Sequence, residues 1–269
     1  AGDRNRTSPF AFTGNKFEFR AVSSNQSIAY PNTALNVAVT ESLDYIATEL
    51  EKATARGASV EAAAAELLPR LVKEHKRIIF NGNGYSKEWE KEAAKRGLLN
   101  LKNTVDALPQ MVTAETLDLF EKYKVLNARE LQSRNEIMFE TYNKVVNVEG
   151  QLMVLMANRY IFPAALEYQT QVAQSVSAVK AAGGTSVEGK KLLTQVTKLT
   201  DTLKRRTDIL ATALDRTNSD AHKQAKYVRD TIIPAMTALR EVGDALEAIV
   251  PHGTWMLPTY REMLFVSKQ

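Results

Sequence analysis

The chain has 269 residues, of which 44% are hydrophobic and 25% charged, values typical of a soluble globular protein with one large domain or two modest ones. It contains no cysteine, which excludes disulfides and thiolate metal sites, and no apolar run long enough to cross a bilayer. The net charge is +4, but basic and acidic residues alternate along the chain, so we expect no nucleic-acid partner.

The N-terminal segment has the pattern of a β-hairpin. Residues 7–13 and 16–22 are β-prone runs on either side of a Gly14-Asn15 turn signal. A lone hairpin is marginal in water, so we expect these strands to join a sheet formed by residues upstream. The chain also begins Ala-Gly-Asp without an initiator methionine, and we interpret it as a fragment.

Helices are expected from residue 33 onward. Residues 33–56 have apolar side chains at helical spacing, and Gly57 fits a C-cap. Further helices are predicted over 60–77, over 86–96 with Ser86 as N-cap, and in two shorter pieces over 105–111 and 114–123. The segment 81–84, Asn-Gly-Asn-Gly, is interpreted as an ordinary loop in preference to a phosphate cradle.

Three long helices are predicted in the second half of the chain. The first covers about 127–181, with a kink or break at Pro163; the second follows a capping-box pattern at 185–188; the third starts near Ser219 and contains Pro234. We expect the last two to form an antiparallel hairpin on the first and the apolar seams of all three to be buried within the subunit. The alternative is that part of this helical region makes contacts in the oligomer. After residue 257 we expect irregular or extended chain. The seams are Val145, Val148, Leu152 and Leu155; Leu192, Val196, Leu199, Leu203 and Leu210, interrupted by Arg206; and Val228, Ile232, Ala235, Leu239, Val242, Leu246 and Ile249.

Chemistry is most strongly indicated at Lys16-Phe17-Glu18-Phe19-Arg20. In a strand, Lys16, Glu18 and Arg20 share one face, because successive side chains point to opposite faces. A carboxylate between two cations is suited to hold Mg²⁺ or Mn²⁺ beside a phosphoryl group whose charge the cations neutralise. For an arbitrary sequence of this kind, a solvated strand face with internal ion pairs is the more common explanation. The convergence of further arginines, including Arg6, and the aromatic opposite face favour a site.

Other catalytic signatures are missing from the sequence. It has no Walker loop, no Gly-x-Ser-x-Gly and no His-Glu-x-x-His motif. The three histidines, at positions 75, 222 and 252, stand alone and are interpreted as surface or helix-end residues.

Several segments resemble the glutamine synthetases, and the type III branch in particular. Residues 2–7 (Gly-Asp-Arg-Asn-Arg-Thr), 16–20 and 27–33 are similar to the closing active-site strands of that family. Residues 80–86 (Phe-Asn-Gly-Asn-Gly-Tyr-Ser) and 258–263 (Pro-Thr-Tyr-Arg-Glu-Met) resemble the type III branch. The resemblance therefore extends over essentially the whole chain.

The resemblance implies an ATP-dependent ligase that joins glutamate and ammonia. By position, Glu18 would bind the divalent metal, Arg6 would contact the transferred phosphoryl group, and Arg20 would contact glutamate or its phosphorylated form. Lys16 would lie on the nucleotide side, at a position the family usually gives to Arg, and Lys lacks the bidentate fork. A further arginine of other branches is replaced here by the stretch 9–12.

We therefore expect an α+β fragment that is mostly α. The N-terminal β-hairpin and helix, residues 1–56, would belong to a glutamine synthetase catalytic domain, and 57–269 would be a type III-specific C-terminal helical region with long antiparallel helices. The resemblance also implies a cytoplasmic homo-oligomer, a double-ringed dodecamer, and an isolated chain that is inactive. The alternatives are a non-catalytic helical interaction or oligomerisation module and a nucleotide-binding regulator derived from the enzyme.

Overall fold

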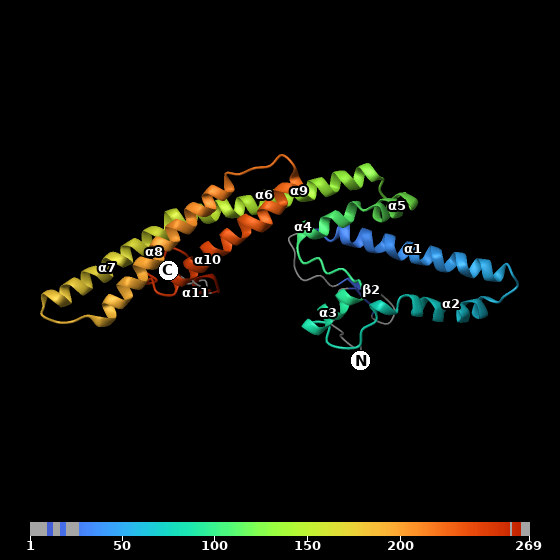
Figure 1. Ribbon diagram of the computed structural model, residues 1–269, viewed down its shortest axis with the longest axis horizontal. Helices are drawn as coiled ribbons and strands as arrows, with labels where there is room; N and C mark the ends of the chain where they lie inside the picture. Colours follow the sequence, from blue (N-terminus) through green and yellow to red (C-terminus); the bar gives the residue numbers. More distant parts are fainter. Residues whose placement is uncertain (1–9, 13–16, 20–26, 259, 265–269) are drawn as a thin grey trace. The chain divides into compact units, whose positions relative to one another are not determined.

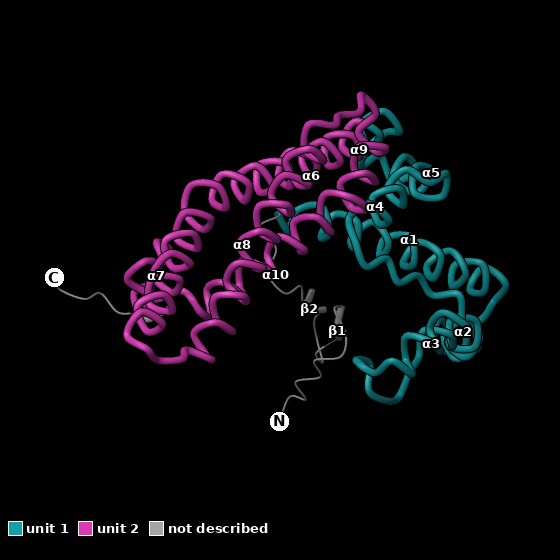
Figure 2. The backbone as a smooth tube through the Cα atoms, turned by 60° about the vertical axis from the view of Figure 1, so that its left-hand side comes forward, with its two compact units in different colours: residues 1–132 teal, residues 133–269 magenta. Residues whose placement is uncertain are grey.

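The computed structural model describes residues 10–12, 17–19, 27–258 and 260–264. By its internal packing the chain divides into unit 1, residues 1–132, and unit 2, residues 133–269 (Figure 2). Each unit has its own buried cluster of hydrophobic side chains. The predicted boundary at residue 56 stays a prediction.

The predicted α+β class is wrong, because the fold that the structure describes is built from helices. Its only β-structure is one antiparallel pair of three-residue strands, β1 (Phe10–Phe12) and β2 (Phe17–Phe19), in which Phe10 lies opposite Phe19. No strand elsewhere in the described residues extends this pair into a sheet. Three-residue strands are too short to form a layer with a buried face, so helices provide the core.

Unit 1 consists of short helices that follow one long helix (Figure 1). Three of its N-caps are side-chain oxygens of the type that helix starts favour: Ser59, Ser86 and Thr113 accept hydrogen bonds from the amides of Ala62, Trp89 and Thr116. The predicted stop at Gly97 is confirmed by its positive φ of 70°. The elements are α1 (Ala29–Thr54), α2 (Val60–Glu74), η1 (Lys76–Ile78), α3 (Lys87–Lys95), α4 (Thr104–Ala107), η2 (Leu108–Val112) and α5 (Ala114–Lys122).

Unit 2 is built around three long helical stretches. The helix α8 packs against both α7 and α10, as predicted for antiparallel helices. The capping box predicted at 185–188 is absent, because the N-cap Ser186 makes no side-chain cap bond and Glu188 pairs with Lys191. Residues 260–264 form a helix where irregular chain was expected. The elements are α6 (Ala128–Met156), η3 (Ala157–Ile161), α7 (Phe162–Ala181), α8 (Val187–Leu214), α9 (Ala221–Tyr227), η4 (Val228–Ile232), α10 (Ile233–Glu247) and α11 (Tyr260–Leu264).

The two internal prolines of unit 2 each follow a π-helical segment. Pro163 stands at the start of α7 directly after η3, and Pro234 stands at the start of α10 directly after η4. Proline lacks an N–H and clashes with the carbonyl one turn earlier in a regular α-helix. The wider turn before each proline removes this conflict, so the helical path continues at Pro163, where the sequence indicated a kink or break, and at Pro234, where a continuous helix was predicted.

The seam of α8 runs through threonines that the apolar pattern did not reveal. The buried positions follow four–three spacing through Thr200 and Thr207, so Arg206 does not interrupt the seam. The hydroxyls of Thr200 and Thr207 donate to the carbonyls of Val196 and Leu203, each at 2.8 Å. These internal bonds satisfy the buried hydroxyls and let them share a core with leucines. The buried line consists of Val196, Thr200, Leu203, Thr207, Leu210 and Leu214.

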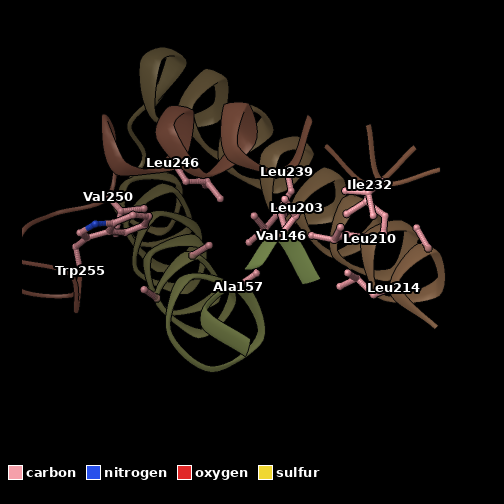
Figure 3. Packing of buried hydrophobic residues seen from close by; sticks show 14 residues of the cluster. Val146, Ala157, Leu203, Leu210, Leu214, Ile232, Leu239, Leu246, Val250 and Trp255 are labelled. Carbon is pink, nitrogen blue, oxygen red and sulfur yellow. The ribbon is translucent and has the colours of Figure 1, made fainter. Parts of the chain in front are cut away.

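The apolar seams differ in their environment. The seam of η4 and α10 faces the core: Ile232, Leu239 and Leu246 are at most 3% exposed, and Ala235, Val242 and Ile249 are partly buried against the same cluster. The seam of α6 is not buried: Val148 is 65% exposed and Leu152 is 52% exposed. We call this exposed row of Ile137, Val145, Val148, Leu152 and Leu155 the α6 stripe. Within unit 2, α6 turns a different face, which includes Val146, toward the core (Figure 3).

Candidate functional site

The predicted site residues lie almost entirely outside the described part of the chain. Arg6, Lys16 and Arg20 are not among the described residues. Glu18 belongs to β2, where its backbone lies opposite Ala11 of β1. The structure thus describes only the backbone of Glu18 among the four, and the roles predicted for these residues stay predictions.

The described residues contain no group of three or more His, Asp or Glu side chains that could hold a metal ion. Of the histidines, His75 ends α2, and His222 stacks on Phe139 with ring centroids 4.6 Å apart. His252 lies 3.6 Å from a carboxylate oxygen of Glu262. The three histidines thus lie at helix ends or on the surface, as the sequence indicated.

The loop at 81–84 is held by aromatic and cationic contacts on either side. Phe80 stacks on Trp89 of α3 with ring centroids 4.1 Å apart, and the Arg96 guanidinium lies 5.5 Å from the Trp89 ring. Arg96 also donates to the carbonyl oxygens of Arg77 and Ile79, at 3.2 and 2.8 Å. These bonds make Arg96 the residue that fixes the path of the chain into the loop, which supports an architectural role for this segment.

A polar cluster of unit 1 joins α1 to the end of α5. Tyr123 donates its hydroxyl toward carboxylate oxygens of Glu41 and Asp44, at 2.6 and 2.8 Å. The Lys122 ammonium lies 2.7 Å from Glu41 and 3.1 Å from Asp44. Glu41 and Asp44 share one face of α1 because they are three residues apart. No local pattern in the sequence indicated this cluster, since some 80 residues separate its two halves.

The four groups of this cluster shift one another's pKa values. The hydrogen bond from Lys122 lowers the pKa of Glu41, and that from Tyr123 lowers the pKa of Asp44. Desolvation and the bond to Glu41 raise the pKa of Tyr123 to about 12. The bond to Glu41 raises the pKa of Lys122. The cluster is thus held in one protonation state, with charged carboxylates, a charged lysine and a neutral tyrosine, which suits a structural role. We call these four residues the clasp.

The clasp makes the stability of unit 1 dependent on pH, and Tyr123→Phe is expected to reduce this dependence. A lowered carboxyl pKa contributes stability above its ordinary value of about 4, and that contribution is lost as the pH falls through the folded-state value. A raised tyrosine pKa contributes stability below its ordinary value of about 10, which is lost as the pH rises toward 12. We expect the stability difference between wild type and Tyr123→Phe, measured by urea denaturation, to be largest near neutral pH and to shrink at both extremes.

The control for this prediction is Tyr160→Phe, at a tyrosine of unit 2 that is 39% exposed. Its stability difference from wild type is expected to be small. A flat pH profile for the Tyr123→Phe difference would contradict the role assigned to the clasp.

Unit 2 contains a cavity of about 620 Å³ between α6, η3, α10 and the segment 255–257. Its walls are mostly apolar, and charged residues of α6 and α10 also line it. None of these residues was predicted as a site residue, because a cavity formed by separate helices leaves no local motif.

No helix among the described residues is both long enough and apolar enough to cross a membrane.

Comparison with known proteins identifies relatives over almost the whole chain. Residues 63–180 match the family model described as the glutamine synthetase C-terminal domain. The chain is 35% identical to a type-3 glutamine synthetase of Dictyostelium discoideum over 276 residues, which is 98% of this chain and 37% of that protein. It is 32% identical to a glutamine synthetase of Butyrivibrio fibrisolvens and 30% identical to one of Bacteroides fragilis, in each case over 98% of this chain. The chain thus spans 37–38% of the length of these relatives.

Proposed function

We propose that this chain, which belongs to the glutamine synthetase family, is the C-terminal part of an ATP-dependent glutamate–ammonia ligase. One observation carries the proposal: the similarity to glutamine synthetases covers 98% of the chain at 30–35% identity. A helical module recruited from elsewhere would match only in part. Because the chain spans 37–38% of those relatives, we also propose that it is inactive alone.

The proposed reaction has two steps. The side-chain carboxylate of glutamate attacks the terminal phosphorus of ATP, and ADP leaves. Ammonia then attacks the acyl phosphate, loses a proton and displaces inorganic phosphate, giving glutamine. Both steps develop negative charge on a phosphoryl group. The protein therefore contributes most to the rate through cationic side chains that stabilise this charge.

In this proposal four residues of the N-terminal segment belong to the active site. Arg6 contacts the transferred phosphoryl group, and Arg20 contacts glutamate or the acyl phosphate. Glu18 binds Mg²⁺ or Mn²⁺, for which carboxylate oxygens are suitable ligands, and Lys16 lies on the nucleotide side. The support is the motif at 16–20 and the placement of Glu18 on a strand. The metal, when bound, would supply charge neutralisation.

The helical region at 57–269 is proposed to be the family's additional C-terminal region. The match of residues 63–180 to the glutamine synthetase C-terminal domain supports this boundary. We further propose that the parent protein is a cytoplasmic homo-oligomer with the double-ringed dodecameric arrangement that the resemblance implies.

The proposal is tested by assaying the purified full-length protein for glutamine with ATP, glutamate, ammonia and Mg²⁺. We expect glutamine and inorganic phosphate in equal amounts, and neither product without ammonia or with the chain 1–269 alone. Absence of glutamine with both Mg²⁺ and Mn²⁺ would overturn the enzyme proposal.

The α6 stripe favours a second candidate function, a helical interaction module. Five large apolar side chains in a row on one face are unusual for a surface that meets only water, and such rows mark contact sites. This function is compatible with catalysis, since the same region can join copies of the enzyme.

A charge placed in the α6 stripe is expected to weaken assembly of the full-length protein. Val148 is 65% exposed, so Val148→Asp disturbs little packing within the chain, whereas in an interface it buries an unpaired carboxylate. We expect smaller species in sedimentation velocity experiments. Val187→Asp, at a 56% exposed valine outside the stripe, is the matched control. Unchanged sedimentation of Val148→Asp would exclude the stripe as an assembly contact.

A further inference from the structure

The cavity of unit 2 has the size and wall composition of a small-molecule site. Its volume of about 620 Å³ falls within the range of about 300–1,000 Å³ that is typical of ligand pockets. Val146, Leu203 and Leu239 come together beside the cavity from α6, α8 and α10 (Figure 3). The remaining apolar lining includes Met153, Met156, Ile161, Met236, Trp255 and Leu257.

One π-helical segment of unit 2, η3, borders this cavity through Ala157 and Ile161. Ile233, the first residue of α10 and the one directly after η4, also lines it. π-helical turns in otherwise regular helices occur frequently at functional sites. Gly243 of α10 contributes to the free space: a Cβ built there would meet only Ile161 Cδ1, at 3.9 Å. The lining methionines can adapt to the shape of a guest, because their side chains are unbranched and flexible.

The charged residues of the cavity are mainly acidic. Arg240 donates to Asp244 at 2.7 Å, so that these two charges compensate one another. Glu149 of α6 and Glu247 of α10 also line the cavity, and neither forms an ion pair with another described residue. Two carboxylates from different helices thus remain beside an apolar space. This charge distribution favours a guest with an apolar body and a positive charge, and disfavours an anion.

We propose that this cavity binds a small organic amine. The apolar body of the amine lies among the methionine and leucine side chains, and its ammonium group lies near Glu149 in one orientation of the amine and near Glu247 in the other. This site is separate from the N-terminal segment to which the catalytic roles are assigned. It therefore gives the helical region a ligand of its own, whatever the activity of the parent protein.

The test is isothermal titration calorimetry of the full-length protein with three probes of one shape: phenylbutylamine, phenylbutanol and phenylbutyrate. We expect the amine to bind most tightly and the carboxylate most weakly. Glu149→Gln and Glu247→Gln each weaken amine binding about threefold, and the double variant about tenfold, without weakening the alcohol. Glu241→Gln, on α10 but outside the cavity, is the matched control and leaves binding unchanged.

Gly243→Leu tests the location by filling the cavity. We expect it to abolish binding of amine and alcohol, and Gly243→Ala to weaken both while the melting temperature is maintained. Amine binding that survives Gly243→Leu would place the site elsewhere. Absence of amine binding to the wild type, or equal affinity for amine and carboxylate, would overturn the proposal.

Discussion

Replacement of Glu18 by Gln is expected to reduce glutamine synthesis by the full-length protein by about a thousandfold. The change keeps the shape of the side chain but removes the negative charge that would hold the divalent cation. An amide oxygen is a much weaker ligand for Mg²⁺ than a carboxylate. Since the cation neutralises the phosphoryl group during transfer, its loss affects the chemical step more than the binding of glutamate.

The dependence of activity on metal concentration distinguishes this role from a structural one. The residual activity of Glu18→Gln should require a higher Mg²⁺ or Mn²⁺ concentration for half-saturation, whereas a folding defect would lower the maximal rate at an unchanged metal requirement. Glu188→Gln serves as the control, because the Glu188 side chain is 83% exposed on α8 and should tolerate the change. Full activity in Glu18→Gln would remove Glu18 from the active site.

The helices of this fold could be predicted from the sequence because their signals are local. Four–three spacing identified the seam of η4 and α10, and the cap residues Ser59 and Ser86 follow from the preference of helix starts for side-chain oxygens. The spacing of apolar residues shows which face of a helix is apolar, but it does not identify what covers that face. For this reason Val145, Val148, Leu152 and Leu155 of α6 were predicted to be buried although they are exposed, and buried Thr207 was overlooked in favour of a break at Arg206.

The β-structure and the polar clusters were less predictable for a different reason. Strands need partners that are distant in the chain, so a hairpin pattern at residues 7–22 could not establish a sheet. The clasp of Glu41, Asp44, Lys122 and Tyr123 depends on how α5 packs on α1, which no local pattern encodes. The proposed catalytic residues rest instead on a motif, which specifies residue types and spacing without tertiary geometry.

The other large effect is expected from Leu203→Ala in the core of unit 2. Leu203 is completely buried on α8, which packs against both α7 and α10. Truncation to alanine removes apolar contacts and leaves a void that the surrounding helices can fill only in part. We expect the free energy of unfolding to fall by about 3–4 kcal/mol, measured by urea denaturation followed by circular dichroism.

Leu152→Ala provides the matched comparison, because it deletes the same atoms from the α6 stripe, where Leu152 is 52% exposed. In a dissociated protein this change should alter the unfolding free energy by no more than about 0.5 kcal/mol. If the stripe is an assembly contact, the cost of Leu152→Ala should increase with protein concentration, since association stabilises the folded state by mass action. The loss of unfolding free energy in Leu203→Ala should not increase with protein concentration, because the contacts of Leu203 lie within one chain. Equal, concentration-independent costs for the two variants would mean that the stripe is covered within the subunit.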